Sequence, residues 1–360
     1  MTPRTAPCLA APAHRAPLHA PSVRVAMAAA VVATLAIAGC GSDDDGGAGS
    51  PGGSGGVAGA GSGGAGGGAG GGAGGAGGQH PAPSPEPCLE DVTPGHHVFT
   101  CDSIVFDLSV PEACFTEACG LIVDVHGFSM SAAMQDANTE LRRRGAEKGY
   151  VVLQPNADPA PPLSSWDGSG ADDGAVFAML ERTMRVFHLD PKRVHFTGFS
   201  QGGGMTWRML CAHAGVFASV APAALAEGCS FQGADVPAAT VPTLFLHGTA
   251  DGLVPFDGAL ALRDAIVAAW SLDAGTKVAG DDDHERVRYV SPGGVPFEFL
   301  THDYEQTTSC LVLDLKGHCF PGSEDPGTAT GQPCSFACPP PSAFDWGAEV
   351  MSFFEAHPKP

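Results

Sequence analysis

A serine flanked by glycines carries the clearest chemical signal in this sequence. Ser200 is the centre of the sequence GFSQG at 198–202, between a run at 193–197 that predicts a buried strand and a segment at 203–214 that predicts a helix. On such a sharp turn the serine Oγ projects from the sheet edge, and the flanking glycines leave room for the strained backbone. The same spacing at 52–56 lies in a glycine tract that can bury no core. The sequence therefore predicts Ser200 as a nucleophile.

The carboxylate that would serve this nucleophile follows another predicted strand. A serine hydroxyl needs a histidine as general base and a carboxylate that orients this histidine. On a turn of this kind the order along the chain is serine, then Asp or Glu, then histidine. Asp251 is the acid of a turn-rich loop after the apolar run at 243–246. We predict that Asp251 orients the base; the alternative is a solvated aspartate in a turn.

Four histidines follow this aspartate in the sequence. His284 lies in an acidic run, His302 follows an apolar run, and His357 lies near the last residue. His318 lies in a punctuated loop just after the run at 311–315, which predicts a strand. This placement at a strand end favours His318 as the general base.

Two backbone N–H groups complete the predicted site, because the oxyanion of a tetrahedral intermediate needs hydrogen-bond donors. Gln201, directly after the serine, is expected to supply one N–H. The other is expected from the loop after the predicted strand at 121–125, where Phe128 is the candidate donor. His126 in the same loop is predicted to be structural, since the site already has its base.

Several further short motifs lie along the chain in a fixed order. They are HG at 126–127, YVVLQP at 150–155, Trp166, DD at 172–173, DPKRV at 190–194, HGTAD at 247–251 and GH at 317–318. In this order they resemble the α/β-hydrolase esterases grouped as feruloyl esterases and polyhydroxybutyrate (PHB) depolymerases. One loop departs from the family. The segment at 316–322 has fewer glycines before its histidine and lacks the tryptophan that family members usually carry before the proline.

The resemblance implies an α/β fold of the α/β-hydrolase type, with a doubly wound, mostly parallel sheet and antiparallel N-terminal strands. It implies a serine carboxylesterase without cofactor or metal. We favour feruloyl-esterase-like action on esters linked to plant polysaccharide, because no polymer-binding domain is expected after the last predicted helix. The alternatives are a PHB depolymerase or oligomer hydrolase, an inactive surface binding module on the same fold, and another acyl-transfer or peptide-cleaving activity.

The elements that must position these residues alternate between apolar runs and helical patterns, as in a sheet with parallel central strands. Strands are predicted at 98–100, 104–108, 121–125, 150–154, 194–197, 218–222, 243–246 and 311–315, and helices at 132–148, 173–187, 203–214, 260–269 and 343–357. The segment between 221 and 241 is too short for a large lid, so we expect an open cleft. Trp166 and Phe128 are candidates to line it; the alternative for Trp166 is packing over the core.

The N-terminal part of the chain predicts export. Residues 1–39 contain arginines but no acidic residue, and their apolar stretch is too short for a comfortable membrane span, so they predict a signal peptide. The sequence around Cys40 resembles the lipobox of bacterial lipoproteins, which implies a lipid anchor on the outer membrane or cell surface; the alternative is simple secretion. Residues 40–87 predict a disordered Gly/Ala/Ser/Pro linker, and 88–360 the catalytic domain, which we expect to be monomeric.

The charge of the chain excludes one class of partner. The net charge is −21 at pH 7, and no basic stripe with interleaved aromatic residues is present. Because such a surface repels phosphate backbones, we expect no nucleic-acid partner. The ligand that the esterase resemblance implies is an ester, small or polymer-linked.

The cysteines predict disulfides. The chain has 12, and leaving out Cys8 in the signal and the lipid-bearing Cys40 gives an even number, which is typical of an exported protein. Neighbours along the chain suggest Cys88 with Cys101, Cys114 with Cys119, Cys211 with Cys229, Cys310 with Cys319, and Cys334 with Cys338. The pair at Cys319 would clamp the loop of His318. A zinc site using His318, Cys319, Cys334 and Cys338 is the alternative, but its spacing matches no common pattern.

Overall fold

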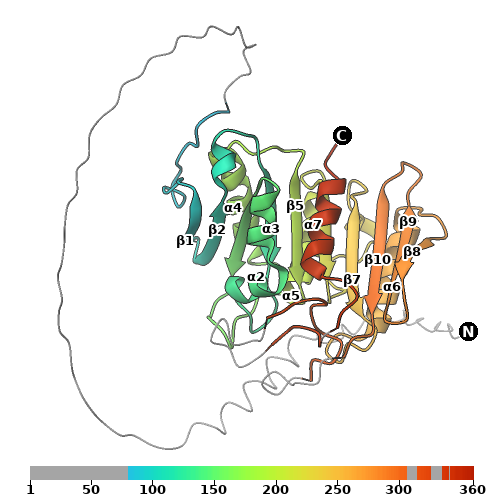
Figure 1. Ribbon diagram of the computed structural model, residues 1–360. Coiled ribbons are helices and arrows are strands. Elements are labelled where there is room, and N and C mark those ends of the chain that lie inside the picture. The colour runs from blue at the N-terminus through green and yellow to red at the C-terminus, as the bar shows by residue number, and fades with distance from the viewer. Residues whose placement is uncertain (1–79, 306–313, 326–334, 340) are drawn as a thin grey trace, which may run out of the picture. The chain divides into compact units, whose positions relative to one another are not determined.

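One mixed sheet runs through the part of the chain that the structure describes. The computed structural model describes residues 80–305, 314–325, 335–339 and 341–360. Ten strands lie in the order β1-β2-β4-β3-β5-β6-β7-β10-β9-β8 (Figure 1). Their bounds are β1 Gly95–Cys101, β2 Ile104–Val110, β3 Gly120–Val125, β4 Tyr150–Asn156, β5 Val194–Phe199, β6 Ser219–Ala223, β7 Thr243–Gly248, β8 Thr276–Gly280, β9 His284–Val290 and β10 Pro296–His302.

The strands in the middle of the sheet, from β4 through β3, β5, β6 and β7 to β10, pair in parallel. Both edges are antiparallel, with β1 and β2 on one side and β9 and β8 on the other. Central parallel strands are covered on both faces and therefore read as continuous apolar runs. Every residue of β3, β5 and β7 is buried. The predicted doubly wound sheet with antiparallel N-terminal strands is confirmed.

Helices cover both faces of the sheet. One core cluster is packed under α2 (Ala132–Thr139), α3 (Leu141–Glu147) and α7 (Trp346–Ala356), and the other under α4 (Asp173–Val186), α5 (Gln201–His213) and α6 (Phe256–Ala269) (Figure 1). The helix α4 shows why: its residues Val176, Met179, Leu180, Thr183 and Val186 are buried at the spacing of one helix face. Short 3-10 helices are η1 (Glu112–Phe115) and η2 (Gly233–Asp235).

Three elements differ from the sequence-based expectation. The helix predicted at 132–148 is two helices, because Glu140 adopts a left-handed backbone with φ of 50° and ends α2 before α3 begins. The hairpin of β8 and β9 was not expected. The strand predicted at 311–315 is wrong for residues 314 and 315, which form no strand. Residues 311–313 lie outside the described residues. The last parallel strand is β10, which pairs with β7.

Three of the expected disulfides are present, Cys88–Cys101, Cys114–Cys119 and Cys211–Cys229. The expected pairs Cys310–Cys319 and Cys334–Cys338 are wrong, because Cys319 is bonded to Cys338. Neighbours in sequence are not neighbours in space here, since residues 320 and 337 form a parallel bridge that brings the two cysteines together. Cys310 and Cys334 lie outside the described residues.

The predicted signal peptide, Cys40 and most of the predicted linker also lie outside the described residues. Within the described ranges, no helix combines the length and the apolar character that a membrane crossing requires.

Candidate active site

Ser200 occupies a strained turn between β5 and α5. Its backbone has φ of 54° and ψ of −117°, a positive-φ conformation that L residues rarely adopt. The turn is held by the Ser200 N–H, which donates to the carbonyl of Ala223 at 2.9 Å. The neighbouring glycines are sterically required: a Cβ at Gly202 would lie 2.0 Å from the carbonyl oxygen of Val125, and one at Gly198 would lie 2.5 Å from the Gly202 backbone. The side chain of Ser200 is thus presented at the carboxyl end of the sheet.

Asp251 and His318 form a buried pair. Nδ1 of His318 lies 2.7 Å from Oδ2 of Asp251 although 67 residues separate them. The other carboxylate oxygen, Oδ1, accepts the N–H groups of Leu253 and Val254 at 2.9 and 2.8 Å. Burial on its own would raise the pKa of Asp251, but the electrostatic interaction with His318 and the hydrogen bonds from His318 and Val254 outweigh burial and lower this pKa. Asp251 is therefore an ionised carboxylate aimed at the imidazole.

The loop of His318 is fixed against the strand that leads to Ser200. It belongs to the long connection between β10 and α7. Phe320 donates its N–H to the carbonyl of Phe336 and accepts the N–H of Cys338, which is joined to Cys319. The ring of Phe320 stacks on that of Phe199 with centroids 4.0 Å apart, and the His318 ring lies 4.8 Å from the same Phe199 ring. Phe199 thus links the candidate base to the candidate nucleophile.

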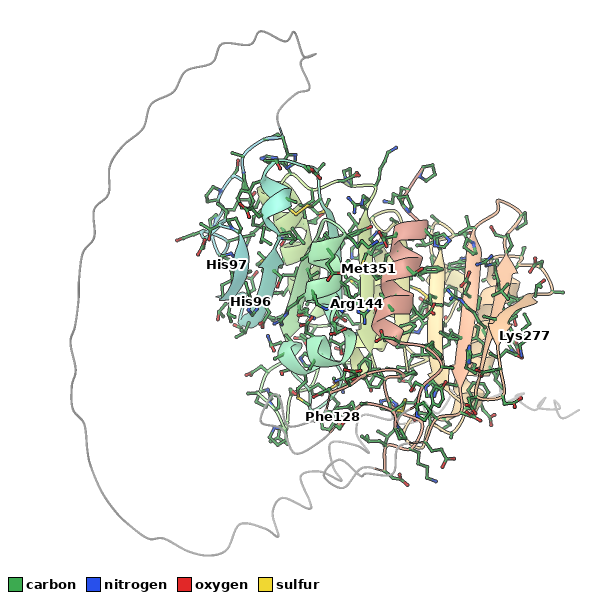
Figure 2. The ribbon with its side chains drawn as sticks, in the orientation of Figure 1. His96, His97, Phe128, Arg144, Lys277 and Met351 are labelled. Carbon is green, nitrogen blue, oxygen red and sulfur yellow. A yellow bond between two sulfur atoms is a disulfide. The ribbon has the colours of Figure 1, made fainter. Side chains whose placement is uncertain are left out.

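The loop after β3 lies beside Ser200 at the same end of the sheet. A Cβ at Gly127 would lie 3.1 Å from Cβ of Ser200, so the two backbones are in close approach. The next residue is Phe128, at the lower end of the molecule in Figure 2. The following N–H, that of Ser129, donates to the carbonyl of Ser164. Gln201 begins α5, where the first N–H groups have no partner within the helix. Phe128 therefore lies in a loop that approaches Ser200, and Gln201 follows Ser200 as the first residue of α5.

His126 links this loop to the residue after β4 through hydrogen bonds of its ring. The N–H of Ala157 donates to its Nε2 at 3.0 Å, so its proton sits on Nδ1, which donates to the carbonyl of Gly127 at 2.7 Å. Burial lowers the pKa of His126 to about 4, which keeps the ring neutral. The structural role expected from the sequence is the one its contacts support.

Trp166 is enclosed rather than open to a cleft. Its side chain is 1% exposed and its indole N–H donates to the carbonyl of His126 at 2.9 Å. Its backbone N–H donates to Oε1 of Gln201, which ties this loop to the first residue of α5. Of the two roles left open for Trp166, these contacts support packing over the core.

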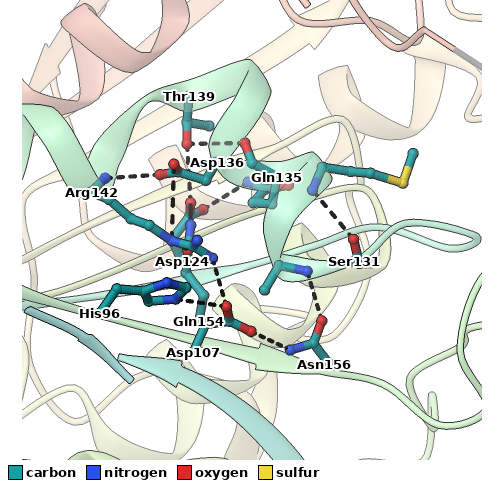
Figure 3. A network of polar contacts seen from close by, with 12 residues as sticks. His96, Asp107, Asp124, Ser131, Gln135, Asp136, Thr139, Arg142, Gln154 and Asn156 are labelled. Atoms are coloured by element: carbon teal, nitrogen blue, oxygen red, sulfur yellow. Dashed lines mark hydrogen bonds and ion pairs between the residues drawn. The ribbon is translucent and has the colours of Figure 1, made fainter. Parts of the chain in front are cut away.

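A polar network braces the strand that carries the His126 loop (Figure 3). The carboxylate of Asp124 is fully buried and accepts hydrogen bonds from Gln135, Thr139 and Gln154 at 2.7 to 3.1 Å. Burial raises the pKa of Asp124 to about 6. These bonds join β3 to α2 and β4, so they fix the end of β3.

The described residues contain no group of three or more His, Cys, Asp or Glu side chains that could hold a metal ion. The disulfide between Cys319 and Cys338 also removes two of the ligands of the zinc alternative. What the arrangement can do is activate a hydroxyl by an oriented imidazole.

Two contributors escaped the sequence reasoning. The sequence presents Phe199 only as part of GFSQG at 198–202 and His247 only as part of HGTAD at 247–251. The contacts of Phe199 with His318 and Phe320 join segments far apart in the chain. Those of His247 with Asp251 and Val254 lie within one turn, but the folded shape of that turn has no periodic trace in the sequence.

Comparison with known proteins shows similarity to esterases over part of the chain. The chain is 28% identical over 137 residues to the bifunctional acetylxylan esterase/xylanase XynS20E of Neocallimastix patriciarum, which covers 38% of this chain and 20% of that protein. It is 28% identical over 152 residues to feruloyl esterase B of Piromyces equi, with 40% and 28% covered. It is 30% identical over 164 residues to feruloyl esterase C of Emericella nidulans, with 44% and 57% covered. The chain thus spans less than two thirds of the length of these relatives.

Among solved structures, an acetyl xylan esterase from Aspergillus awamori matches with a TM-score of 0.51 and 11% identity, over 72% of this chain and 99% of that chain. This likeness concerns the fold, which is that of the α/β-hydrolases. No protein-family model matches the chain.

Proposed function

We propose that this chain, an α/β-hydrolase fold similar in sequence to feruloyl and acetylxylan esterases, is an exported serine carboxylesterase that acts on esters linked to plant polysaccharide. Ser200 is the nucleophile, His318 the general base and Asp251 the orienting carboxylate. The observation that carries the proposal is the 2.7 Å contact between Nδ1 of His318 and Oδ2 of Asp251, in a loop packed on Phe199 beside Ser200.

In the proposed reaction, Oγ of Ser200 attacks the ester carbonyl while Nε2 of His318 takes the serine proton. The tetrahedral intermediate collapses, the bond to the alcohol oxygen breaks, and His318 returns the proton to that oxygen. Water then attacks the acyl-enzyme with His318 again as base, and the acid leaves as Ser200 regains its proton. Asp251 holds the ring and stabilises the imidazolium in both steps.

The proposed oxyanion hole consists of the N–H groups of Phe128 and Gln201. The close approach of Gly127 to Ser200 and the start of α5 at Gln201 support this assignment. A single donor of this kind is worth about 3 kcal/mol of transition-state stabilisation.

Export is supported by the four disulfides of the described residues, because such bonds persist in oxidising compartments. We propose in addition that Cys40 carries a lipid that holds the enzyme at the outer membrane or cell surface. The Cys40→Ser variant should lose processing before residue 40 and lose labelled palmitate. A wild-type chain that takes up no palmitate would show that the protein is simply secreted.

A substrate panel tests the proposed specificity against its main alternative, PHB oligomers. The panel is methyl ferulate, acetylated xylan, the trimer of 3-hydroxybutyrate and a long-chain triglyceride. We expect measurable turnover of the first three substrates and very little of the triglyceride. A preference for the 3-hydroxybutyrate trimer by more than about a hundredfold in kcat/KM, roughly 2.7 kcal/mol, would favour the depolymerase. No turnover of any ester by the folded protein would favour the inactive binding module.

A further inference from the structure

Buried histidines gather around the carboxylate of Asp251. His247, at the end of β7, has a fully buried side chain and lies with Nε2 3.7 Å from Oδ2 of Asp251. His302, at the end of β10, is 1% exposed, and the parallel register of β10 and β7 pairs it with Gly248, the residue after His247. Of these rings only His318 is within hydrogen-bond distance of the carboxylate in the described chain. The burial of His247 and His302 beside the site therefore needs a separate explanation.

The contacts of His247 identify its proton. Its Nε2 lies 3.0 Å from the carbonyl oxygen of Val254, and a carbonyl oxygen can only accept. The proton is therefore on Nε2, while Nδ1 is buried without a partner in the described residues. Burial lowers the pKa of His247 despite the nearby charge of Asp251, so the ring is neutral. Because the His247 ring is neutral, it forms no ion pair with Asp251, and His318 is the imidazole that pairs with this carboxylate.

Val254 is held at both of its backbone groups. Its N–H donates to Oδ1 of Asp251 at 2.8 Å, and its carbonyl accepts from His247 at 3.0 Å. The N–H of Leu253 also donates to Oδ1, at 2.9 Å. His247 thus closes a ring of contacts that runs from the end of β7 through the turn at 251–254 and back.

We propose that His247 is a positioning residue for the esterase reaction: its N–H fixes the turn at 251–254 and so keeps Oδ2 of Asp251 aimed at Nδ1 of His318. This role rests on the proposed function. His247 touches no reacting atom in it. Because the turn acts on catalysis only through the orientation of the base, losing its anchor should lower kcat and leave KM almost unchanged.

The test compares substitutions that keep or remove the donor. In His247→Gln the amide can place an N–H where Nε2 stood, whereas His247→Leu has no donor and His247→Asn is too short to reach Val254. With p-nitrophenyl acetate we expect kcat to fall by about 10- to 100-fold in the Leu and Asn variants, with KM within about twofold. The Gln variant should recover most of kcat. The Asn variant serves if the Leu variant does not fold.

A double-mutant cycle separates this role from general destabilisation. In the Asp251→Asn background, His247→Leu should cost little more kcat, because its effect passes through Asp251. The matched control is His195→Leu: His195 is also a fully buried strand histidine, bonded to Oγ of Ser219 at 2.8 Å, but on β5 before the turn. It should lower the thermal midpoint without lowering kcat.

The outcomes distinguish the two proposals. Full turnover in a folded Ser200→Ala variant overturns the proposed function and this role with it. An inactive Ser200→Ala variant together with wild-type kcat in a folded His247→Leu variant overturns only the role of His247. Equal losses in the Gln and Leu variants, or fully additive losses with Asp251→Asn, also overturn it.

Discussion

The imidazole of His318 lies against the ring of Phe199, the residue that directly precedes Ser200, with ring centroids 4.8 Å apart. The loop of the proposed base is therefore packed onto the strand of the proposed nucleophile.

Removing the nucleophile should abolish catalysis and spare the fold. In Ser200→Ala we expect p-nitrophenyl acetate hydrolysis to fall by several orders of magnitude, about as far as in His318→Ala, because the three side chains act as a unit. Asp251→Asn should be milder. The control is Ser352→Ala, an exposed serine of α7, which should keep wild-type kcat. Circular dichroism must show that each variant is folded, and wild-type turnover in folded Ser200→Ala would refute the mechanism.

Replacing the aromatic ring of Phe199, which contacts both His318 and Phe320, should lower kcat by more than the loss of stability explains. Phe199→Leu removes part of the surface on which His318 and Phe320 rest, so we expect a lower kcat and a loss of about 1 to 2 kcal/mol in the free energy of unfolding. Phe196→Leu is the matched control, since Phe196 is also fully buried on β5 but packs on Phe217. It should cost similar stability at unchanged kcat. Equal kcat losses in the two variants would argue against the link through Phe199.

Breaking the disulfide beside the base should affect catalysis. In the double variant Cys319→Ser with Cys338→Ser we expect a loss of about 2 to 4 kcal/mol in stability and a lower kcat, because the loop of His318 loses its covalent anchor. The control is Cys114→Ser with Cys119→Ser, a disulfide that precedes β3 at the opposite end of that strand from Gly127. Its loss should lower stability only. Unchanged kcat in the Cys319 and Cys338 variant would show that noncovalent packing suffices.

The buried carboxylate of Asp124 should make stability depend on pH. Burial raises its pKa to about 6 in the folded protein, above the ordinary value of 3.8. A raised folded pKa contributes stability that is complete below about pH 4 and is lost as pH rises through about 6. Asp124→Asn cannot titrate. The free energy of unfolding of the wild type, minus that of the variant, should therefore increase by about 1 to 3 kcal/mol from pH 7 to pH 4. A constant difference in urea titrations would contradict the assignment.

The sequence by itself determined the elements whose patterns are local. The apolar runs of β3, β5 and β7 and the spacing of α4 predict buried strands and an amphipathic helix, because burial on two faces or on one leaves a direct periodic trace. The glycines around Ser200 likewise encode a turn with no room for a Cβ. The order serine, aspartate, histidine then proposes the site.

The tertiary structure decided which distant residues meet. The examples are the disulfide of Cys319 with Cys338, the enclosure of Trp166, the stacking of Phe320 on Phe199 and the contact of His318 with Asp251. No local pattern encodes such contacts, because their free energy exists only once the sheet has brought the strand ends together. The sequence predicts which residues form the site, and the fold determines how these residues are oriented toward one another.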